Sequence, residues 1–394
     1  MPKASNGRVY IWELKGWPNL SFKLGTLALP LANARRAQGE LLGLVRALQV
    51  DRSELAREAA ADAMSLEVIS NSAIEGVKLD PESVKASMLL RLGARQGGIQ
   101  PGPVRRVDAV VKVLTDAVHG FDRPLSEDLI FGWHKALFPG GVDDGGWPIP
   151  VGQLRGTEPM QVVTRPYAGS ESIVHFEAPG RENLQEELND FLEWFNAPPE
   201  GLDGILRAGL AHLWFVTVHP FADGNGRVTR TISDLALAQD EKSALRFYSL
   251  SAQILRDKKA YYEALEKAQR GKLDVTAWLM WMLQEIEAAM RQGLAEVQRV
   301  LTRSRFWAYA NTQKLNARQA KVLHRILGAG VKEYGVVSRD FYLKILGDGT
   351  STSTATRDLQ DLVVKGLTEP LAAKGRSHSY RVALERFETG TAIR

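Results

Sequence analysis

The sequence of 394 residues contains no cysteine and only seven histidines. The lack of cysteine excludes disulfide bonds, thiolate nucleophiles and cysteine-ligated zinc. No uncharged apolar run approaches the roughly 18 residues that a membrane-spanning helix needs, and the first residues lack the apolar core of a secretion signal. We therefore expect a protein without a membrane partner and with a cytoplasmic location.

Composition and length favour a folded protein of more than one unit. Hydrophobic residues make up 44% of the chain and charged residues 24%, close to the average of globular proteins. A chain of this length exceeds what one hydrophobic core usually serves, so two or three packed units are expected.

Positive charge is concentrated at the C-terminal end. Residues 301–394 hold 16 Lys and Arg against 8 Asp and Glu, a balance of +8, although the whole chain carries only +4. Residues 1–300 therefore carry −4. A contact with a polyanion such as nucleic acid is expected in the C-terminal part, unless these charges are ordinary solvated surface.

Apolar residues recur three and four positions apart in long segments, which predicts a mainly α protein. Stretches rich in Gly and Pro interrupt this pattern near residues 97–103 and 139–150. Three regions follow: an N-terminal helical region over 1–100, a middle region over 101–298 that holds the polar motifs, and a basic region over 299–394. Within the middle region, residues 160–165 and 172–177 read as two β-strands around a Gly-containing turn, which predicts a β-hairpin flap.

The most informative segment is HPFADGNGRVTR, residues 219–230. Pro220 ends an apolar helix, the glycines permit close backbone approach, and a new helix then begins. Free N–H groups at the start of a helix are a usual seat for phosphate. Arg227 and Arg230 in the first turns oppose the helix dipole by about 0.3–1 kcal/mol each, so they call for an anion such as a di- or triphosphate.

Two further residues of this segment have chemistry that suits phosphate transfer. Asp223 is a hard oxygen ligand for a Mg²⁺ ion on phosphate oxygens. His219 has an ordinary pKa near 6.5, which suits a general base that takes a proton from a hydroxyl. Two other readings remain open: a structural loop histidine, and a hydrolytic metal site of His212, His219 and Asp223. A P-loop is excluded, because its motif does not occur.

HPFADGNGR followed by VTR resembles the signature of the Fic family, which is HPF, any residue, Asp or Glu, GNGR, two residues and Arg. Every specified position is matched, and the resemblance extends over roughly residues 100–290, including VGQLRG at 151–156. It implies a Fic-type helical core that transfers AMP from the co-substrate ATP, with Mg²⁺, to a Ser, Thr or Tyr hydroxyl of a target protein.

The resemblance also implies roles for individual residues. His219 resembles the base and Asp223 the Mg²⁺ ligand, and Phe221 resembles the residue that anchors the loop in the core. The remaining positions resemble the phosphate cradle and the two phosphate-binding arginines: Gly224, Asn225, Gly226, Arg227 and Arg230, the last facing the γ-phosphate.

The flap and one aromatic pair extend the expected site. The flap edge at Met160, Gln161, Val162 and Val163 resembles the family's docking edge, where an extended target segment pairs through main-chain hydrogen bonds. Tyr261 and Tyr262 lie where the family contacts the nucleotide base, although aromatics at helical spacing can equally be core residues.

Residues 67–80, EVISNSAIEGVKLD, resemble the family's inhibitory helix. Glu75 and Gly76 match its motif, and Asn71 stands where Ser or Thr is usual. Independently of the resemblance, Glu75 lies in the last turn of a helix stopped by Gly76, and Arg230 lies in a first turn, so each charge is at the unfavourable end of its helix. We expect the two to pair, which would place Glu75 where a γ-phosphate binds.

From Asn316 onward, the predicted order is helix, turn, short helix, turn and helix, followed by two apolar stretches, LTEPLA and SYRVAL, around a polar segment. This order resembles a winged helix-turn-helix. Its recognition helix would be Ser353–Lys365. Its wing would carry Lys374, Arg376 and His378, and the basic balance suits phosphate contacts. Asp358 and Asp361 are expected to reduce the basicity of the recognition helix. Protein docking or dimerisation is the alternative use.

We therefore predict a mainly α, Mg²⁺-dependent protein adenylyltransferase that Glu75 inhibits, with a C-terminal winged helix. Its expected partners are an unidentified target protein, which can be the chain itself, and DNA, with a homodimer left open. Two alternatives remain: a DNA-binding regulator whose Fic site senses nucleotide, and a Fic-type enzyme that removes AMP or transfers another phosphorylated group.

Overall fold

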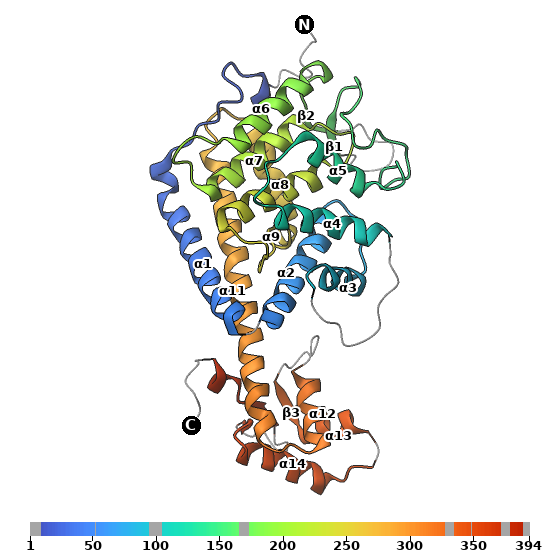
Figure 1. Ribbon diagram of the computed structural model, residues 1–394, viewed down its shortest axis with the longest axis vertical. Helices are drawn as coiled ribbons and strands as arrows, with labels where there is room; N and C mark the ends of the chain where they lie inside the picture. The colour runs from blue at the N-terminus through green and yellow to red at the C-terminus, as the bar shows by residue number, and fades with distance from the viewer. Residues whose placement is uncertain are drawn as a thin grey trace. The chain divides into compact units, whose positions relative to one another are not determined.

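The computed structural model describes residues 9–51, 53–93, 105–164, 173–327, 335–347, 349–371 and 379–388 (Figure 1). It divides into two compact units, Met1–Leu294 and Ala295–Arg394. The first unit takes in both the predicted N-terminal helical region and most of the predicted core. Helices predominate in the described residues, as expected, and none of those helices is long and apolar enough to span a bilayer.

The first unit is built from helices and one hairpin. Its elements are η2 (Ile11–Glu13), α1 (Leu24–Asp51), α2 (Ser53–Ile74), α3 (Pro81–Arg91), α4 (Arg105–His119), α5 (Glu127–Leu137), β1 (Gln161–Thr164), β2 (Ile173–Glu177), η3 (Arg181–Asn183), α6 (Leu184–Asn196), α7 (Gly204–Val218), α8 (Asn225–Glu241), α9 (Leu250–Arg256) and α10 (Lys258–Gln269). The long helix α11 (Thr276–Thr312) begins in this unit and ends in the second.

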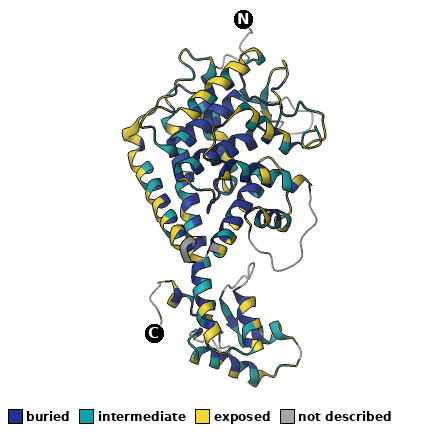
Figure 2. Cartoon of the chain, in the orientation of Figure 1, coloured by how far each residue is buried: buried dark blue, intermediate teal, exposed yellow. Residues whose placement is uncertain are grey.

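Helices α7 and α8 form the centre of the first unit and pack against each other more extensively than any other pair. Asp203 begins α7 by accepting hydrogen bonds from the backbone N–H groups of Ile205 and Leu206. Every residue from Ala208 to Val218 is buried, as expected for a helix that is apolar on all sides. Figure 2 shows both helices dark blue, whereas α1 is exposed along one side. The loop between them is therefore held on a rigid frame.

The predicted hairpin is present. β1 and β2 pair antiparallel with Gln161 opposite Glu177, and the register shifts between Val162 and Val163. The turn at residues 165–172 lies outside the described residues.

Helix α2 ends where the sequence predicts. It runs to Ile74, and Gly76 adopts a positive φ of 83°, which closes the helix in the left-handed region that glycine tolerates. α2 packs against α1, α3, α9, α4 and α8. Glu75, which follows α2, bonds to Arg230 of α8, so the C-terminal end of α2 lies beside the first turns of α8.

The second unit contains α12 (Ala317–Ile326), β3 (Val336–Ser338), α13 (Arg339–Leu346), α14 (Thr352–Val364), β4 (Thr368–Pro370), β5 (Ser379–Val382) and η4 (Leu384–Phe387). The strands form an antiparallel sheet in the order β3-β5-β4. The predicted helices occur in the predicted order, β4 and β5 lie in the two apolar stretches, and β3 was not expected. The winged-helix assignment stays a prediction, and Lys374, Arg376 and His378 lie outside the described residues.

One expectation about α14 was wrong. Asp358 does not reduce the charge of an exposed face, because its carboxylate is buried and accepts hydrogen bonds from Arg318 of α12 and Tyr342 of α13. Asp361 is half-exposed and pairs with Lys365. The acidic groups of α14 are thus neutralised within the unit.

Candidate active site

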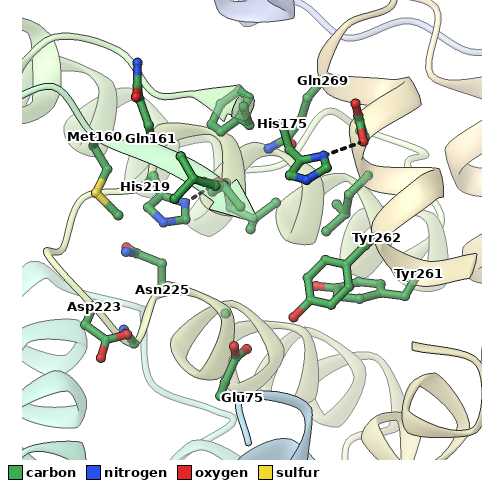
Figure 3. Close-up of a pocket in the computed structure, with 18 of the residues that line it drawn as sticks. Glu75, Met160, Gln161, His175, His219, Asp223, Asn225, Tyr261, Tyr262 and Gln269 are labelled. Atoms are coloured by element: carbon green, nitrogen blue, oxygen red, sulfur yellow. Dashed lines mark hydrogen bonds and ion pairs between the residues drawn. The ribbon is translucent and has the colours of Figure 1, made fainter. Parts of the chain in front are cut away.

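A cavity of about 740 Å³ opens at the start of α8. This volume suits a nucleotide-sized ligand. Its walls come from the loop between α7 and α8, from the flap, from α10 and from the end of α2. Figure 3 shows Glu75 pointing into this space, with His219 and Asn225 on one side and Tyr261 and Tyr262 on the other.

The loop backbone turns twice through the left-handed region. His219 follows α7 with φ 52° and ψ 57°, and Gly224 precedes α8 with φ 79°. A Cβ atom at Gly224 would lie 2.6 Å from Cε2 of Phe138, so only glycine fits there. These two turns aim the N-terminus of α8 into the cavity.

Asn225 holds the loop closed. Its Oδ1 accepts from the N–H of Phe221 at 2.9 Å, and its Nδ2 donates to the carbonyl of Phe221 at 2.8 Å. Phe221 is fully buried, as its predicted anchoring role requires, and it stacks on His134 with 4.0 Å between ring centroids. The side chain of Asn225 lines the cavity but is engaged within the loop, so its contact with phosphate stays a prediction.

Two residues that support the loop were not identified from the sequence. His134 accepts from the N–H of Gly152 through Nδ1 and donates from Nε2 to the carbonyl of Asp223, both at 3.0 Å. Arg155 donates from Nε to the carbonyl of His219 at 2.9 Å. Arg155 lies in VGQLRG, whose resemblance was noted without a role, whereas nothing local in the sequence distinguishes His134.

His219 is held as a neutral base. Its Nδ1 lies 3.0 Å from the carbonyl oxygen of Val216, which can only accept, so the proton is on Nδ1 and the lone pair is on Nε2. Burial lowers its pKa to about 4, with the nearby charge of Arg155 in the same direction and the Val216 bond against it. The imidazole is therefore uncharged at neutral pH, with Nε2 free of a proton.

Asp223 offers one carboxylate to the cavity. Its Oδ1 accepts from the N–H of Gly224 at 2.5 Å, and burial raises its pKa, against the effect of that bond and of Arg227. Among the described residues no group of three or more His, Asp or Glu side chains could hold a metal ion. Such a site fits Mg²⁺ only as an ion shared with phosphate oxygens, which is how Mg²⁺ is commonly bound.

The predicted pair of Glu75 and Arg230 is present. Arg230 donates from NH2 to Oε1 of Glu75 at 2.6 Å. The Arg230 side chain is only 2% exposed, and that of Glu75 is 28% exposed. Asn71 completes the contact, because its Oδ1 accepts from Nε of Arg230 at 2.6 Å. The residue that departs from the family's inhibitory motif therefore bonds directly to the arginine.

The Glu75 carboxylate also lies against Gly226. A Cβ atom at Gly226 would be 2.3 Å from Oε1 of Glu75, so the lack of a side chain there makes room for the carboxylate. Burial would raise the pKa of Glu75, but the charge and hydrogen bond of Arg230 outweigh it and the pKa is lowered. An ionised carboxylate thus occupies the anion position at the start of α8.

Arg227 has different surroundings from those expected. It does not line the cavity; its guanidinium lies over the Phe138 ring at 4.7 Å and pairs with Asp144 at 2.9 Å. Asp144 also pairs with Arg106. Nε of Arg227 is buried without a hydrogen-bond partner among the described residues. The binding of phosphate by Arg227 stays a prediction.

The two tyrosines divide between core and cavity. Tyr261 is buried, and its hydroxyl lies 2.9 Å from Nε2 of His212, whose Nδ1 lies 2.9 Å from the hydroxyl of Ser233. Both nitrogens of His212 are therefore engaged, which removes it from a metal site with His219 and Asp223. Tyr262 is 39% exposed and lines the cavity with Tyr261.

The flap forms the opposite wall. Met160, Gln161, Val162 and Val163 line the cavity, together with His175 and Phe176 of β2. A neutral imidazole, a half-exposed carboxylate, a helix N-terminus and a strand edge therefore meet in one cavity. Together these define the class of site expected for transfer of a phosphorylated group.

The comparisons identify the central part of this unit. Residues 124–237 match the Fic/DOC family, and residues 10–94 match a domain of unknown function, DUF4172. Residues 124–237 therefore form a Fic/DOC family domain, and the His219–Arg230 loop lies inside it.

Individual proteins resemble parts of the chain. It is 35% identical over 98 residues to "Protein adenylyltransferase Fic" of Nematostella vectensis, which is 24% of this chain and 21% of that protein. It is 28% identical over 203 residues to "Protein adenylyltransferase fic-1" of Caenorhabditis briggsae, which is 51% of this chain and 34% of that protein. The match thus spans between a fifth and about a third of these relatives. A Fic family protein from Desulfovibrio desulfuricans G20, of known structure, is 21% identical with 93% and 97% coverage and a TM-score of 0.47.

Proposed function

We propose that this chain is a protein adenylyltransferase that transfers AMP from ATP to a Ser, Thr or Tyr hydroxyl of a target protein and is inhibited by Glu75. The observation that carries the proposal is the Glu75 carboxylate on Arg230 and Gly226, beside the neutral His219. A site that holds a carboxylate at a helix N-terminus is built for an anion.

The proposed reaction uses residues of the loop. The acceptor hydroxyl attacks the α-phosphorus of ATP, the new O–P bond forms as the bond to the β-phosphate oxygen breaks, and pyrophosphate leaves. Nε2 of His219 takes the hydroxyl proton, because Nδ1 is engaged with Val216. Asp223 would hold Mg²⁺, which supplies charge neutralisation on the phosphates when bound. Most of the catalysis is positioning and electrostatics.

Inhibition follows from exclusion. Glu75 and a γ-phosphate would compete for Arg230, and two anions cannot share one buried guanidinium without strong repulsion. ATP then binds with its chain of phosphates displaced from the in-line position. The names of the relatives, both protein adenylyltransferases, support the same activity.

The test compares labels and variants. We expect the Glu75→Gly protein, incubated with ATP and Mg²⁺, to acquire label from α-labelled ATP but not from γ-labelled ATP, and to show an AMP adduct on itself by mass spectrometry. His219→Ala in the same background should abolish the adduct. His119→Ala should not, because His119 is at the C-terminal end of α4 and does not line the cavity. Label from the γ-position would instead indicate phosphate transfer, and release of AMP from a modified protein would indicate the reverse reaction.

A second candidate function concerns the second unit. We propose that α14 contacts DNA, because Asp358 faces inward and leaves Ser353, Arg357 and Gln360 on the exposed side of the helix. Arg357→Glu should weaken binding to duplex DNA and reduce its dependence on salt, measured by fluorescence anisotropy. If the wild-type protein shows no salt-dependent binding to any duplex, protein docking replaces this function.

A further inference from the structure

A short aromatic stretch near the N-terminus packs on the flap. Tyr10 and Ile11 are buried, and η2 begins with a hydrogen bond from the N–H of Tyr10 to Glu13 at 2.6 Å. Tyr10 belongs to a small hydrophobic cluster, separate from the main core, that contains Phe176 and Ala178 with Trp12, Met160 and Val162 against it. Most of this cluster is flap.

Two contacts tie this stretch to β2. Trp12 donates from its indole N–H to the carbonyl of Glu177 at 2.8 Å, at the last residue of the strand. Tyr10 meets Phe176 edge to face, with 5.2 Å between ring centroids and an interplanar angle of 79°. Such a pair contributes beyond the apolar area that it buries. One contact thus acts on the strand backbone and the other on a side chain.

The same flap residues face the cavity. Met160, Val162 and Phe176 line it, and the ring of Phe176 lies 6.5 Å from that of His219. A two-stranded hairpin is at best marginally stable alone, so its position depends on what packs against it. On the side of α10 the flap is held by His175 with Glu266 and by Arg270, which donates to the carbonyl of Val174. Tyr10 and Trp12 hold it as well, and the short helix η2 that contains Trp12 also packs against α10.

The stretch is itself firmly attached beyond the flap. The indole of Trp17 donates to the carboxylate of Glu187 in α6, at 2.9 and 3.0 Å. Ser21 pairs with the segment before α11, where its N–H donates to the carbonyl of Leu273 and its carbonyl accepts from Val275, both at 2.8 Å. The aromatic stretch is therefore a fixed support for the flap.

We infer that Tyr10 and Trp12 are positioning residues that set the flap edge on which the acceptor docks. The inference rests on the proposed function in assigning that edge to the acceptor. The DUF4172 match at residues 10–94 includes both this stretch and Glu75. This region thus reaches the site from two sides, with Tyr10 and Trp12 at the acceptor wall and Glu75 at the phosphate seat.

The first experiment is hydrogen–deuterium exchange of the whole protein without nucleotide. We expect Trp12→Phe, which removes only the indole N–H, to speed exchange of the flap strands about fivefold, the value of one net hydrogen bond. Tyr10→Ala should speed it more, while the amides of α7 keep the parent rate and show that the fold is intact.

Trp17→Phe is the matched control, because it removes the same donor from the same stretch but from a bond to α6. It should speed flap exchange less than Trp12→Phe does, because Trp17 acts on the flap only through the rest of the stretch. The inference is overturned if Trp12→Phe and Tyr10→Ala leave the flap at the parent rate, or if Trp17→Phe speeds it equally.

The second experiment separates acceptor docking from nucleotide binding. In the Glu75→Gly background, with a His219→Ala copy of the chain as acceptor, Tyr10→Ala should raise the KM for the acceptor several-fold and change the KM for ATP less than twofold. Equal changes in both would overturn the inference. If no variant transfers AMP at all, the proposed function fails, and the exchange experiment alone still decides whether these residues position the flap.

Discussion

Two ion pairs of similar chemistry, one in each unit, have different surroundings. Arg230 of α8 pairs with Glu75 at the end of α2 at 2.6 Å, and Arg318 of α12 pairs with Asp358 of α14 at 2.7 Å. Each fastens one helix to another, and in each the pKa of the carboxyl is lowered despite its burial. Arg318 donates two hydrogen bonds to its carboxylate, whereas Arg230 donates one to Glu75.

The difference lies in what else meets the carboxylate. Asp358 also accepts from Tyr342 and Asn316, so both its oxygens are satisfied inside one hydrophobic cluster. Glu75 has Arg230 as its bonded partner and stands on the wall of a 740 Å³ cavity. The first arrangement fixes a fold. The second can be exchanged, because an anionic ligand that enters the cavity can take over the arginine.

The largest effect is expected when the pair of Glu75 and Arg230 is broken. Glu75→Gly should raise the rate of AMP transfer about a hundredfold, since removing one partner of a largely buried pair changes the balance by about 3 kcal/mol. Glu75→Gln, which keeps the hydrogen-bonding reach without the charge, should give an intermediate rate. Initial rates with α-labelled ATP measure both. Equal rates for the parent and Glu75→Gly would contradict exclusion by Glu75.

Breaking the fixed pair should act on stability instead. Asp358→Ala leaves the buried Tyr342 hydroxyl without its partner and should lower the free energy of unfolding of the second unit by about 2–3 kcal/mol. Transfer of AMP should not change. Asp361→Ala, which removes a half-exposed pair with Lys365 and one hydrogen bond from Gln319, is the control and should cost about 1 kcal/mol. Urea denaturation followed by tryptophan fluorescence measures both, and a changed transfer rate would refute the distinction.

A smaller effect on the rate of AMP transfer is expected from Asn71, which hydrogen-bonds to Arg230. Asn71→Ala removes the acceptor at Nε of Arg230 but leaves Glu75 in place, so the pair weakens without being lost. We expect transfer to rise at least tenfold, since a hydrogen bond to a charged group contributes about 1.5 kcal/mol or more. Asn71→Ser tests whether a shorter polar group restores inhibition. A rate equal to that of Glu75→Gly would mean that Asn71, and not the carboxylate, holds the inhibited state.

The smallest expected effect concerns pH. The pKa of His219 is lowered to about 4, so the neutral base is present above that value and lost as the pH falls through it. Transfer by the Glu75→Gly protein should therefore change less than twofold between pH 8 and 6. A histidine with the ordinary pKa near 6.5 would lose about three quarters of its neutral form by pH 6. A rate profile with an apparent pKa near 6.5 would contradict the buried, neutral state of His219.

The loop and its inhibitor were predictable because their signals are local. A proline, two glycines and the spacing of apolar residues define the end of one helix and the start of the next. Glu75 and Arg230 could be matched across 155 residues because Glu75 follows the last turn of α2 and Arg230 lies near the start of α8. The helix-end argument alone applies equally to Arg227, which pairs with Asp144, and the resemblance to the family motif selected Arg230.

Other contacts between residues far apart in the sequence could not be predicted. Arg155 bonds to the carbonyl of His219, but VGQLRG, the segment that holds it, gave no role for it. Asp144 takes the charge of Arg227 and has no local pattern that marks it. Tyr10 and Trp12 lie in a segment without helical periodicity. Asp358 was misjudged for a different reason. It lies on the same helix face as the apolar residues Ala355, Leu359 and Leu362, and this spacing predicts that Asp358 is buried despite its charge.

The position of Glu75 at the end of α2 has a thermodynamic consequence. If a triphosphate and this carboxylate exclude each other, ligand binding and the release of the helix end are linked, and the linkage is reciprocal. Any molecule that binds the released end of α2 would raise the affinity of the protein for nucleotide. Nucleotide would raise the affinity for that molecule by the same factor. Binding at a distant position on one helix could then regulate the site as effectively as a change in the cavity itself.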